Sequence, residues 1–233
     1  HNLFKEVKMG HKMVDYKEVR GRMNPGDIVA FSGKGHFSEI IKWATRAPVS
    51  HVGIVFESKI LFDDEAQPGK VVDIFEATTL HEDPVTGKKI AGVQKNRMSD
   101  RVKYYDGILC WLPLSKKARS KLDLKKFVNF LMHQDDKEYD MPQAVKSALD
   151  ALDNIPFLGR TTYNSEDFSA FFCSELATAA LEAGGAISRI NASEVTPIDL
   201  CRFDLFGETY YQIKGGKREI GGYSTTNPEG FGM

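Results

Sequence analysis

Cysteine is scarce in this sequence. The 233 residues include three cysteines, Cys110, Cys173 and Cys201, and none of them is part of a CxxC metal-binding pair. This pattern excludes a disulfide-rich scaffold, and the odd number leaves at least one free thiol if the chain is monomeric. A chain of this length buries enough surface to fold without disulfides or a structural metal.

Neither sign of charge predominates. The 31 Lys and Arg residues are balanced by 32 Asp and Glu residues, which gives a formal net charge of −1. A dedicated nucleic-acid-binding protein usually carries a basic excess. We therefore expect no nucleic acid partner.

Long hydrophobic runs are also missing. No apolar run approaches the roughly 18 residues that suggest a transmembrane helix, so we expect no integral membrane segment, and peripheral lipid contact stays open. The sequence has no HExxH or HxxxH motif, and Gly33 and Gly35 are not part of a phosphate-binding loop. We therefore expect neither a metal site nor a cofactor.

The order of the hydrophobic segments indicates a single α+β domain. An apolar run after the Asn24–Asp27 turn predicts a buried strand, and Gly184-Gly185 predicts the end of an Ala-rich helix. We also expect a polar loop from the second strand up to Gly69 and a hairpin turn over residues 83–87. The expected strands cover residues 28–31, 50–56, 71–77 and 104–114, with one more ending near Val93, and the expected helices cover residues 37–46, 124–131 and 171–183, with another after Pro142.

Cys173 is the first candidate for chemistry. It lies near the start of the helix expected over residues 171–183, where free backbone N–H groups and the positive end of the helix dipole stabilise a thiolate. The same N–H groups can stabilise an oxyanion on a carbonyl under attack. The alternative is an inert core cysteine, because free cysteine is among the most buried residue types.

A cysteine nucleophile needs a general base and a group that orients the base. His51 starts an apolar strand, where its imidazole can face the helix that carries Cys173; a hydrogen-bonded histidine without a catalytic role is the alternative. Glu76 lies among apolar residues on the next strand, and a buried carboxylate there needs a partner such as an imidazolium, whereas at a sheet edge it would be solvated. His36 and His81 could replace His51, and Asp73 competes with Glu76.

Three parts of the sequence, taken together, resemble a known family. The first part is Gly26-Asp27-Ile28-Val29, Ile41-Lys42-Trp43-Ala44-Thr45 and Ser50-His51-Val52-Gly53-Ile54. The second is Phe75-Glu76-Ala77, and the third is Tyr139-Asp140 with Phe172-Cys173-Ser174-Glu175-Leu176. In this order and spacing they resemble the circularly permuted papain-like cysteine hydrolases of the NlpC superfamily. The resemblance covers roughly residues 24–200 and is greatest to the YiiX/YaeF-like amidase group, which is distantly similar to lecithin:retinol acyltransferase.

The resemblance implies a fold, a domain arrangement and a set of site residues. It implies an antiparallel sheet packed against helices, with the nucleophile helix after the sheet, in a catalytic domain of residues 24–214 between an N-terminal arm (1–23) and an irregular tail (215–233). It also implies that Cys173 is the nucleophile, His51 the base and Glu76 the group that orients His51, with Tyr139 as an oxyanion or substrate-binding group. Phe172 departs from the family pattern, in which tyrosine is frequent, so a hydrogen bond from that position is lost.

The activity implied by the resemblance is that of a cysteine amidase or peptidase. Such an enzyme would cleave an amide bond of a small peptide, a cell-wall fragment or an N-acyl compound through a thioester intermediate. A lipid acyltransferase or phospholipase is one alternative, as in the acyltransferase relatives. A non-catalytic lipid- or peptide-binding module is another, although the presence of both Cys173 and His51 counts against it.

The compartment and the oligomeric state stay open at this point. The family resemblance favours either the bacterial cytoplasm or the cell envelope. The chain begins with His1 and not with Met, so a removed signal peptide is compatible with the sequence.

Overall fold

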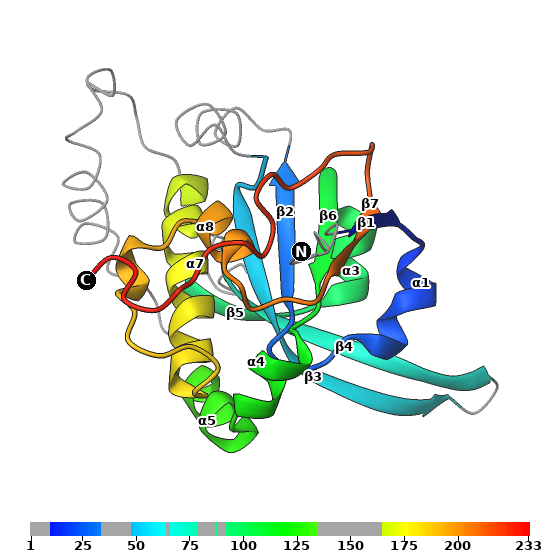
Figure 1. Ribbon diagram of the computed structural model, residues 1–233. Helices are drawn as coiled ribbons and strands as arrows, with labels where there is room; N and C mark the ends of the chain where they lie inside the picture. The colour runs from blue at the N-terminus through cyan, green and yellow to red at the C-terminus, as the bar shows by residue number, and fades with distance from the viewer. Residues whose placement is uncertain (1–9, 34–47, 64–65, 79–86, 88–91, 135–164) are drawn as a thin grey trace, which may run out of the picture.

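The computed structural model describes residues 10–33, 48–63, 66–78, 87, 92–134 and 165–233. These residues form a seven-stranded sheet with helices on both of its faces (Figure 1). The strands are β1 (Gly10–Met13), β2 (Ile28–Gly33), β3 (His51–Asp63), β4 (Ala66–Thr78), β5 (Gly92–Arg97), β6 (Gly107–Leu112) and β7 (Thr209–Lys214). The helices are α1 (Tyr16–Val19), η1 (Arg20–Arg22), α3 (Met98–Tyr104), α4 (Lys116–Lys121), α5 (Leu124–Gln134), α7 (Ser165–Ala183), η2 (Ala192–Glu194) and α8 (Pro197–Arg202).

The sheet is mixed. Its strand order is β1-β7-β6-β2-β3-β4-β5, in which β1 and β7 run parallel and all other neighbours run antiparallel. The expected α+β class is therefore confirmed, whereas the expectation of a purely antiparallel sheet is wrong at β1. A strand of either direction can pair with the backbone donors and acceptors at the edge of β7, so edge pairing does not require β1 to run antiparallel. The expectation that the nucleophile helix follows the whole sheet is also wrong, because β7 comes after α7 in the chain.

The hairpin of β3 and β4 extends beyond the rest of the sheet (Figure 1). The expectation of a polar loop up to Gly69 is wrong, because pairing continues from Ile54↔Phe75 to Asp63↔Ala66, with irregularities after Val55 and Leu61. An antiparallel ribbon satisfies its own backbone hydrogen bonds and can expose side chains on its faces. Polar composition is therefore no reason for the strands to end. β5 pairs with β4, as the expected hairpin requires, but the expectation that this strand ends near Val93 is wrong, because β5 begins at Gly92 and runs to Arg97.

The strand expected over residues 104–114 is shorter in the structure, where β6 runs from Gly107 to Leu112. A short helix that the sequence did not predict, α3, precedes it and ends at Tyr104. A Cβ atom at Gly107 would lie 2.4 Å from the backbone oxygen of Ser32, so only glycine permits this close approach between β6 and β2. The presence of α3 matters for the site, since this helix carries Arg101.

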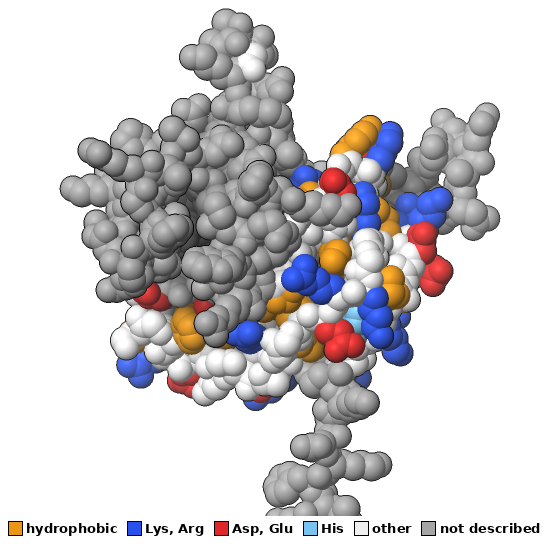
Figure 2. Space-filling model, turned by 90° about the horizontal axis from the view of Figure 1, so that it is seen from above, with side chains coloured by type: hydrophobic (Ala, Val, Ile, Leu, Met, Phe, Trp, Pro, Cys, Tyr) orange, Lys and Arg blue, Asp and Glu red, His pale blue; other side chains and the backbone are white. Residues whose placement is uncertain are grey.

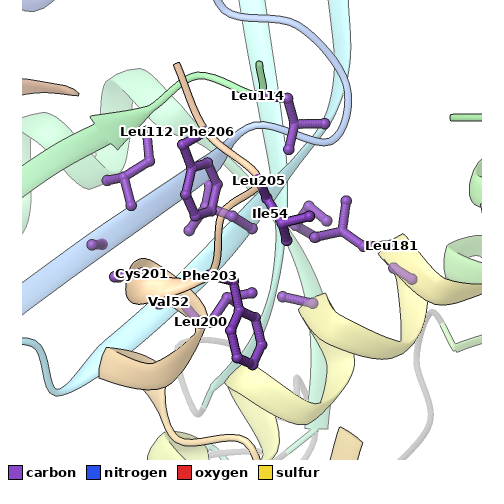
Figure 3. Packing of buried hydrophobic residues seen from close by; sticks show 14 of the residues in the cluster. Val52, Ile54, Leu112, Leu114, Leu181, Leu200, Cys201, Phe203, Leu205 and Phe206 are labelled. Atoms are coloured by element: carbon purple, nitrogen blue, oxygen red, sulfur yellow. The ribbon is translucent and has the colours of Figure 1, made fainter. Parts of the chain in front are cut away.

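Two hydrophobic cores cover the two faces of the sheet. Successive strand residues point to opposite faces, so Ala30 of β2 belongs to the core under α7 and α8, and Phe31 belongs to the core under α1 and α3. Figure 3 shows Val52 of β3 in the first core, together with Leu181 of α7 and Phe203 next to α8. The helices on the two faces can thus present side chains to the strands from opposite sides.

The turn before β2 is fixed by Asp27, whose carboxylate is fully buried. It accepts hydrogen bonds from the Trp111 indole N–H (3.0 Å) and the Leu114 backbone N–H (2.8 Å), and it forms an ion pair with Arg119. Gly26 has a φ of +88°, which favours glycine. These contacts tie the start of β2 to β6 and α4, and the expected turn at this position is confirmed.

Two expected helices agree with the structure at the ends that the sequence marks. α5 begins at Leu124, as expected, and α7 ends at Ala183, directly before Gly184-Gly185. Gly185 adopts a φ of +79°, and its N–H donates to the Glu182 carbonyl (2.8 Å), as a helix C-cap requires. The helices expected over residues 37–46 and after Pro142 lie outside the described residues.

The described parts of both terminal segments pack on the sheet. β1 pairs with β7, and the His11 ring stacks on the Tyr210 ring with centroids 4.9 Å apart. After β7, Ile220 and Tyr223 are buried, and the Ile220 N–H donates to the Tyr210 hydroxyl at 2.8 Å. Residues 10–22 and 215–233 therefore both contribute side chains to the packing around the sheet.

The surface view adds two observations. Figure 2 shows basic, acidic and hydrophobic side chains interspersed over the described part of the upper face, in keeping with the balanced charge. Within the described residues, no helix has the length and apolar character required to cross a bilayer.

Candidate active site

His51 and Glu76 form the centre of the candidate site. His51 is the first residue of β3, and Glu76 lies near the end of the neighbouring strand β4. The His51 Nε2 atom is 2.7 Å from the Glu76 Oε2 atom. The Glu76 side chain is 0 % exposed and the His51 side chain 12 %, so this contact is shielded from water. An ionised carboxylate only accepts hydrogen bonds, so His51 Nε2 is the donor.

Two further residues hold the Glu76 carboxylate. Asn96 of β5 donates from Nδ2 to Oε1 at 3.1 Å. Arg101 of α3 places Nε 2.8 Å from Oε1 and donates from Nη2 to Oε2 at 3.3 Å. Asp73, the competitor on the same strand, instead lies 3.9 Å from Arg97 and is partly exposed.

The pKa of Glu76 is lowered in this environment. Burial alone would raise it, but the hydrogen bond from His51 and the guanidinium of Arg101 outweigh the effect of burial. Glu76 is therefore a buried carboxylate that stays ionised, with both of its oxygens engaged.

Cys173 approaches His51 from the opposite face of the sheet. The helix that carries Cys173, α7, packs against β3 and β4. Cys173 itself is 1 % exposed. The backbone N–H of Val52 donates to the sulfur at 3.4 Å. Val52 directly follows His51 in the chain, so the sulfur lies at the start of β3. There, α7 on one face of the sheet and α3 on the other both contribute side chains near His51.

The protonation behaviour of His51 reflects both neighbours. Burial lowers the pKa of the imidazole, but the charge of the Cys173 thiolate, a side-chain hydrogen bond with Cys173 and the Glu76 carboxylate together raise it to about 9. With Nε2 committed to Glu76, the other ring nitrogen, Nδ1, is the one available to take a proton from the sulfur. The three side chains can therefore work as nucleophile, base and orienting group.

One expectation about Cys173 is wrong. α7 begins at Ser165 and not near Phe171, so Cys173 lies more than two turns inside the helix. A backbone N–H at that depth is bonded to the carbonyl four residues earlier and is not one of the free donors of a helix N-terminus. The N–H group near the sulfur comes instead from Val52.

His133 is exposed on the last turn of α5, where its Nδ1 lies 2.6 Å from the Asn129 carbonyl oxygen, away from the network around Glu76. Tyr139, His36 and His81 lie outside the described residues, so the expected role of Tyr139 stays a prediction.

Arg101 and Asn96 are site residues that the sequence reasoning missed. Neither lies in a recognisable motif, and the sequence predicted no helix over residues 98–104. The signal that could have pointed to these partners was the buried position expected for Glu76, because a buried carboxylate needs more than one hydrogen-bond or ion-pair partner. The chain contains 31 Lys and Arg residues, and the pattern did not tell which of them is the cation.

The other two cysteines have different surroundings. Burial raises the pKa of Cys110 to about 12 and that of Cys201 also well above its usual value. Both are buried in the core under α7 and α8. They are therefore expected to be unreactive in the folded protein, which makes them internal controls for Cys173.

No protein-family model matches the chain, and no curated protein is significantly similar to it. Among the described residues, no three His, Cys, Asp or Glu side chains are grouped as a metal site would require.

Replacing Cys173 with Ala should lower the pKa of His51 from its value of about 9. Two of the interactions that raise it come from the cysteine side chain, whereas burial, which lowers it, remains. Titration of the His51 ring by NMR measures the shift. Cys110→Ala serves as the control and should leave the titration unchanged, whereas an unchanged His51 pKa in Cys173→Ala would contradict the coupling.

Proposed function

We propose that this protein is a cysteine hydrolase of the amidase or peptidase type, with the permuted papain-like arrangement that the sequence resemblance implies. The observation that carries the proposal is the position of the Cys173 sulfur, which accepts a hydrogen bond from the residue directly after His51, while the His51 imidazole is paired with the buried Glu76. A cysteine that only fills the core has no need for a buried imidazole paired with a carboxylate. The order of the chain, with the His51 strand before the Cys173 helix, agrees with permutation.

The proposed reaction starts with transfer of the Cys173 thiol proton to His51. The sulfur then attacks the carbonyl carbon of an amide, and the N–H of Val52, 3.4 Å from the sulfur, supports its negative charge before the attack. As the C–N bond breaks, His51 gives its proton to the leaving amine, and the acyl group remains on sulfur as a thioester.

Hydrolysis of the thioester completes the cycle. His51 accepts a proton from water while the water oxygen attacks the thioester carbonyl. The C–S bond then breaks, the carboxylic acid leaves, and the proton on His51 returns to the Cys173 sulfur. Throughout the cycle Glu76 stays ionised and stabilises the imidazolium, as the carboxylate of a catalytic triad does.

Alkylation with iodoacetamide at neutral pH tests the reactive cysteine. We expect modification of Cys173 alone in the folded protein, and of Cys110 and Cys201 only after unfolding, because burial raises the pKa of both control thiols. Peptide mapping by mass spectrometry identifies the modified site. Since Cys173 is 1 % exposed, the experiment also tests whether a reagent can reach the sulfur. Labelling that appears only on unfolding would contradict the proposal.

A second assay tests the bond that is cleaved. The protein is incubated with short peptide amides, soluble cell-wall peptides, N-acyl amides and a phospholipid ester, and Cys173→Ala is the control in each case. We expect release of an amine from at least one amide, together with a transient acyl adduct on Cys173 detected by mass spectrometry. Release of fatty acid from the phospholipid, with no amide cleaved, would favour the lipid acyltransferase or phospholipase alternative.

A further inference from the structure

We infer that Arg101 is a positioning residue of this site, which fixes His51 for catalysis by clamping the carboxylate of Glu76. The inference rests on the proposed function for its kinetic consequence. The contacts that carry it connect α3 with β4, and none of the motifs behind the family resemblance includes them.

The guanidinium binds both carboxylate oxygens. Its Nε lies 2.8 Å from Glu76 Oε1, and its Nη2 donates to Oε2 at 3.3 Å. His51 bonds to Oε2 and Asn96 to Oε1, so each oxygen has two partners. The Nη2 contact is a directed hydrogen bond and the Nε contact is a close ion pair, so the planar guanidinium holds both oxygens, which a point charge such as a lysine ammonium does less well.

Aromatic rings hold the guanidinium in place. The Arg101 Cζ atom is 4.9 Å from the centroid of the Phe31 ring and 5.3 Å from that of the Tyr105 ring. The Phe31 ring in turn makes an edge contact with the His51 ring, with centroids 5.0 Å apart. Phe31 therefore touches both ends of the His51–Glu76–Arg101 chain. The Arg101 side chain is 11 % exposed, so this arrangement is nearly sealed from water.

The clamp has a chemical consequence for His51. While Glu76 is ionised and fixed, it accepts a hydrogen bond from His51 Nε2, which keeps the proton on that nitrogen and leaves Nδ1 free to accept the thiol proton. A carboxylate that rotates or becomes protonated would not select this tautomer. Arg101 prevents both changes without touching the imidazole nitrogen that reacts.

Within the part of the chain that the structure describes, few charged groups face Glu76. His51 faces it from β3 and Arg101 from α3, whereas Asn96 of β5 is neutral. Burial raises the pKa of Tyr105, so its phenol stays neutral as well. Among these described neighbours, Arg101 is the permanent cation, since His51 loses its charge at high pH.

The test uses Arg101→Gln, Arg101→Lys, Glu76→Gln and the double variant Arg101→Gln/Glu76→Gln. The readout is the rate of Cys173 alkylation by iodoacetamide at neutral pH, which needs no substrate. We expect a loss of about tenfold for Arg101→Gln, typical of groups that orient a reactive side chain, and a smaller loss for Arg101→Lys. Because Arg101 acts through Glu76, the double variant should be no slower than Glu76→Gln alone.

A second readout separates positioning from a merely structural role. The pKa of the Glu76 carboxyl, followed by NMR, should rise in Arg101→Gln and rise less in Arg101→Lys. Arg97→Gln is the control, because Arg97 is half-exposed and lies 3.9 Å from Asp73, and it should change neither readout. Circular dichroism establishes whether each variant is folded. If Arg101→Gln is unfolded, the comparison of Arg101→Lys with wild type decides the role of Arg101.

The outcomes separate this inference from the proposed function. Folded Arg101 variants with the wild-type alkylation rate and an unchanged Glu76 pKa would overturn the inference, as would additive losses in the double variant. A wild-type protein that is alkylated at Cys173 but cleaves no amide or ester would overturn only the proposed function. The NMR comparison would then still decide the role of Arg101.

Discussion

The alkylation rate of Cys173 should fall at least about 100-fold when His51 is replaced by glutamine, in line with the usual contribution of a general base. In the wild-type protein His51 takes the thiol proton, and its pKa of about 9 means that it holds this proton at neutral pH. Glutamine can donate a hydrogen bond from its amide to Glu76 in its place, but it cannot take up a proton. The sulfur would then have to ionise without an imidazolium beside it, in a site that is 1 % exposed.

The matched control is His133→Gln, which changes the same residue type at an exposed position on α5. It should leave the rate unchanged within about twofold, in line with the small effect of substitutions away from a site. The measurement is the loss of free Cys173 with time at several iodoacetamide concentrations, which gives a second-order rate constant for each variant. Equal rates for His51→Gln and wild type would show that His51 does not activate the cysteine.

The pairing of His51 with Glu76 could be predicted because it depends on local geometry. Both residues lie in apolar strand patterns, and hairpin pairing brings Ile54 opposite Phe75, so Glu76 comes close to the start of β3. Gly53 contributes to this arrangement, because a Cβ there would lie 3.1 Å from Ile74 and 3.6 Å from Phe31. The strand that carries His51 can thus pack closely against the core that surrounds Glu76.

The start of α7 was less predictable. Residues 165–170 are mostly polar. The apolar residues that suggested the helix are Phe168, Phe171 and those that follow. In retrospect, Ser165 followed by Glu166 and Asp167 has the composition of a helix N-terminus, where hydroxyl and acidic side chains satisfy free N–H groups and favour the dipole. Hydrophobicity alone therefore placed the helix start too late and gave Cys173 the wrong backbone environment.

The partners on α3 could not be predicted from the sequence, for a different reason. Arg101 contacts Glu76 only because β5 returns alongside β4 and the chain then turns into a short helix over the same face. Met98 is the fully buried residue of α3, so the helix has little apolar periodicity to reveal it. Contacts of this kind come from tertiary packing, and no local pattern specifies them.

The second large effect concerns stability. Glu76→Gln should destabilise the fold by about 2–4 kcal/mol, because it removes the negative partner of a nearly buried guanidinium and imidazolium. Glutamine keeps the size of the side chain, so the loss comes from charge and hydrogen bonding and not from a cavity. Urea unfolding followed by circular dichroism measures the difference. Asp73→Asn, on the same strand but partly exposed and 3.9 Å from Arg97, should change stability by less than about 1 kcal/mol.

The pH dependence of this destabilisation follows from the two shifted groups. The pKa of Glu76 is lowered in the folded state, so its contribution is present above its ordinary value of 4.5 and is lost as the pH falls through the folded value. The pKa of His51 is raised, so its contribution is complete below its ordinary value of 6.5 and is lost as the pH rises through about 9. The difference between wild type and Glu76→Gln should therefore be greatest between about pH 5 and pH 7 and should shrink on both sides. A stability difference that does not vary with pH would mean that Glu76 stabilises the fold through its shape and neutral hydrogen bonds. In that case the charges of the His51–Glu76–Arg101 chain would not be what holds His51 beside Cys173.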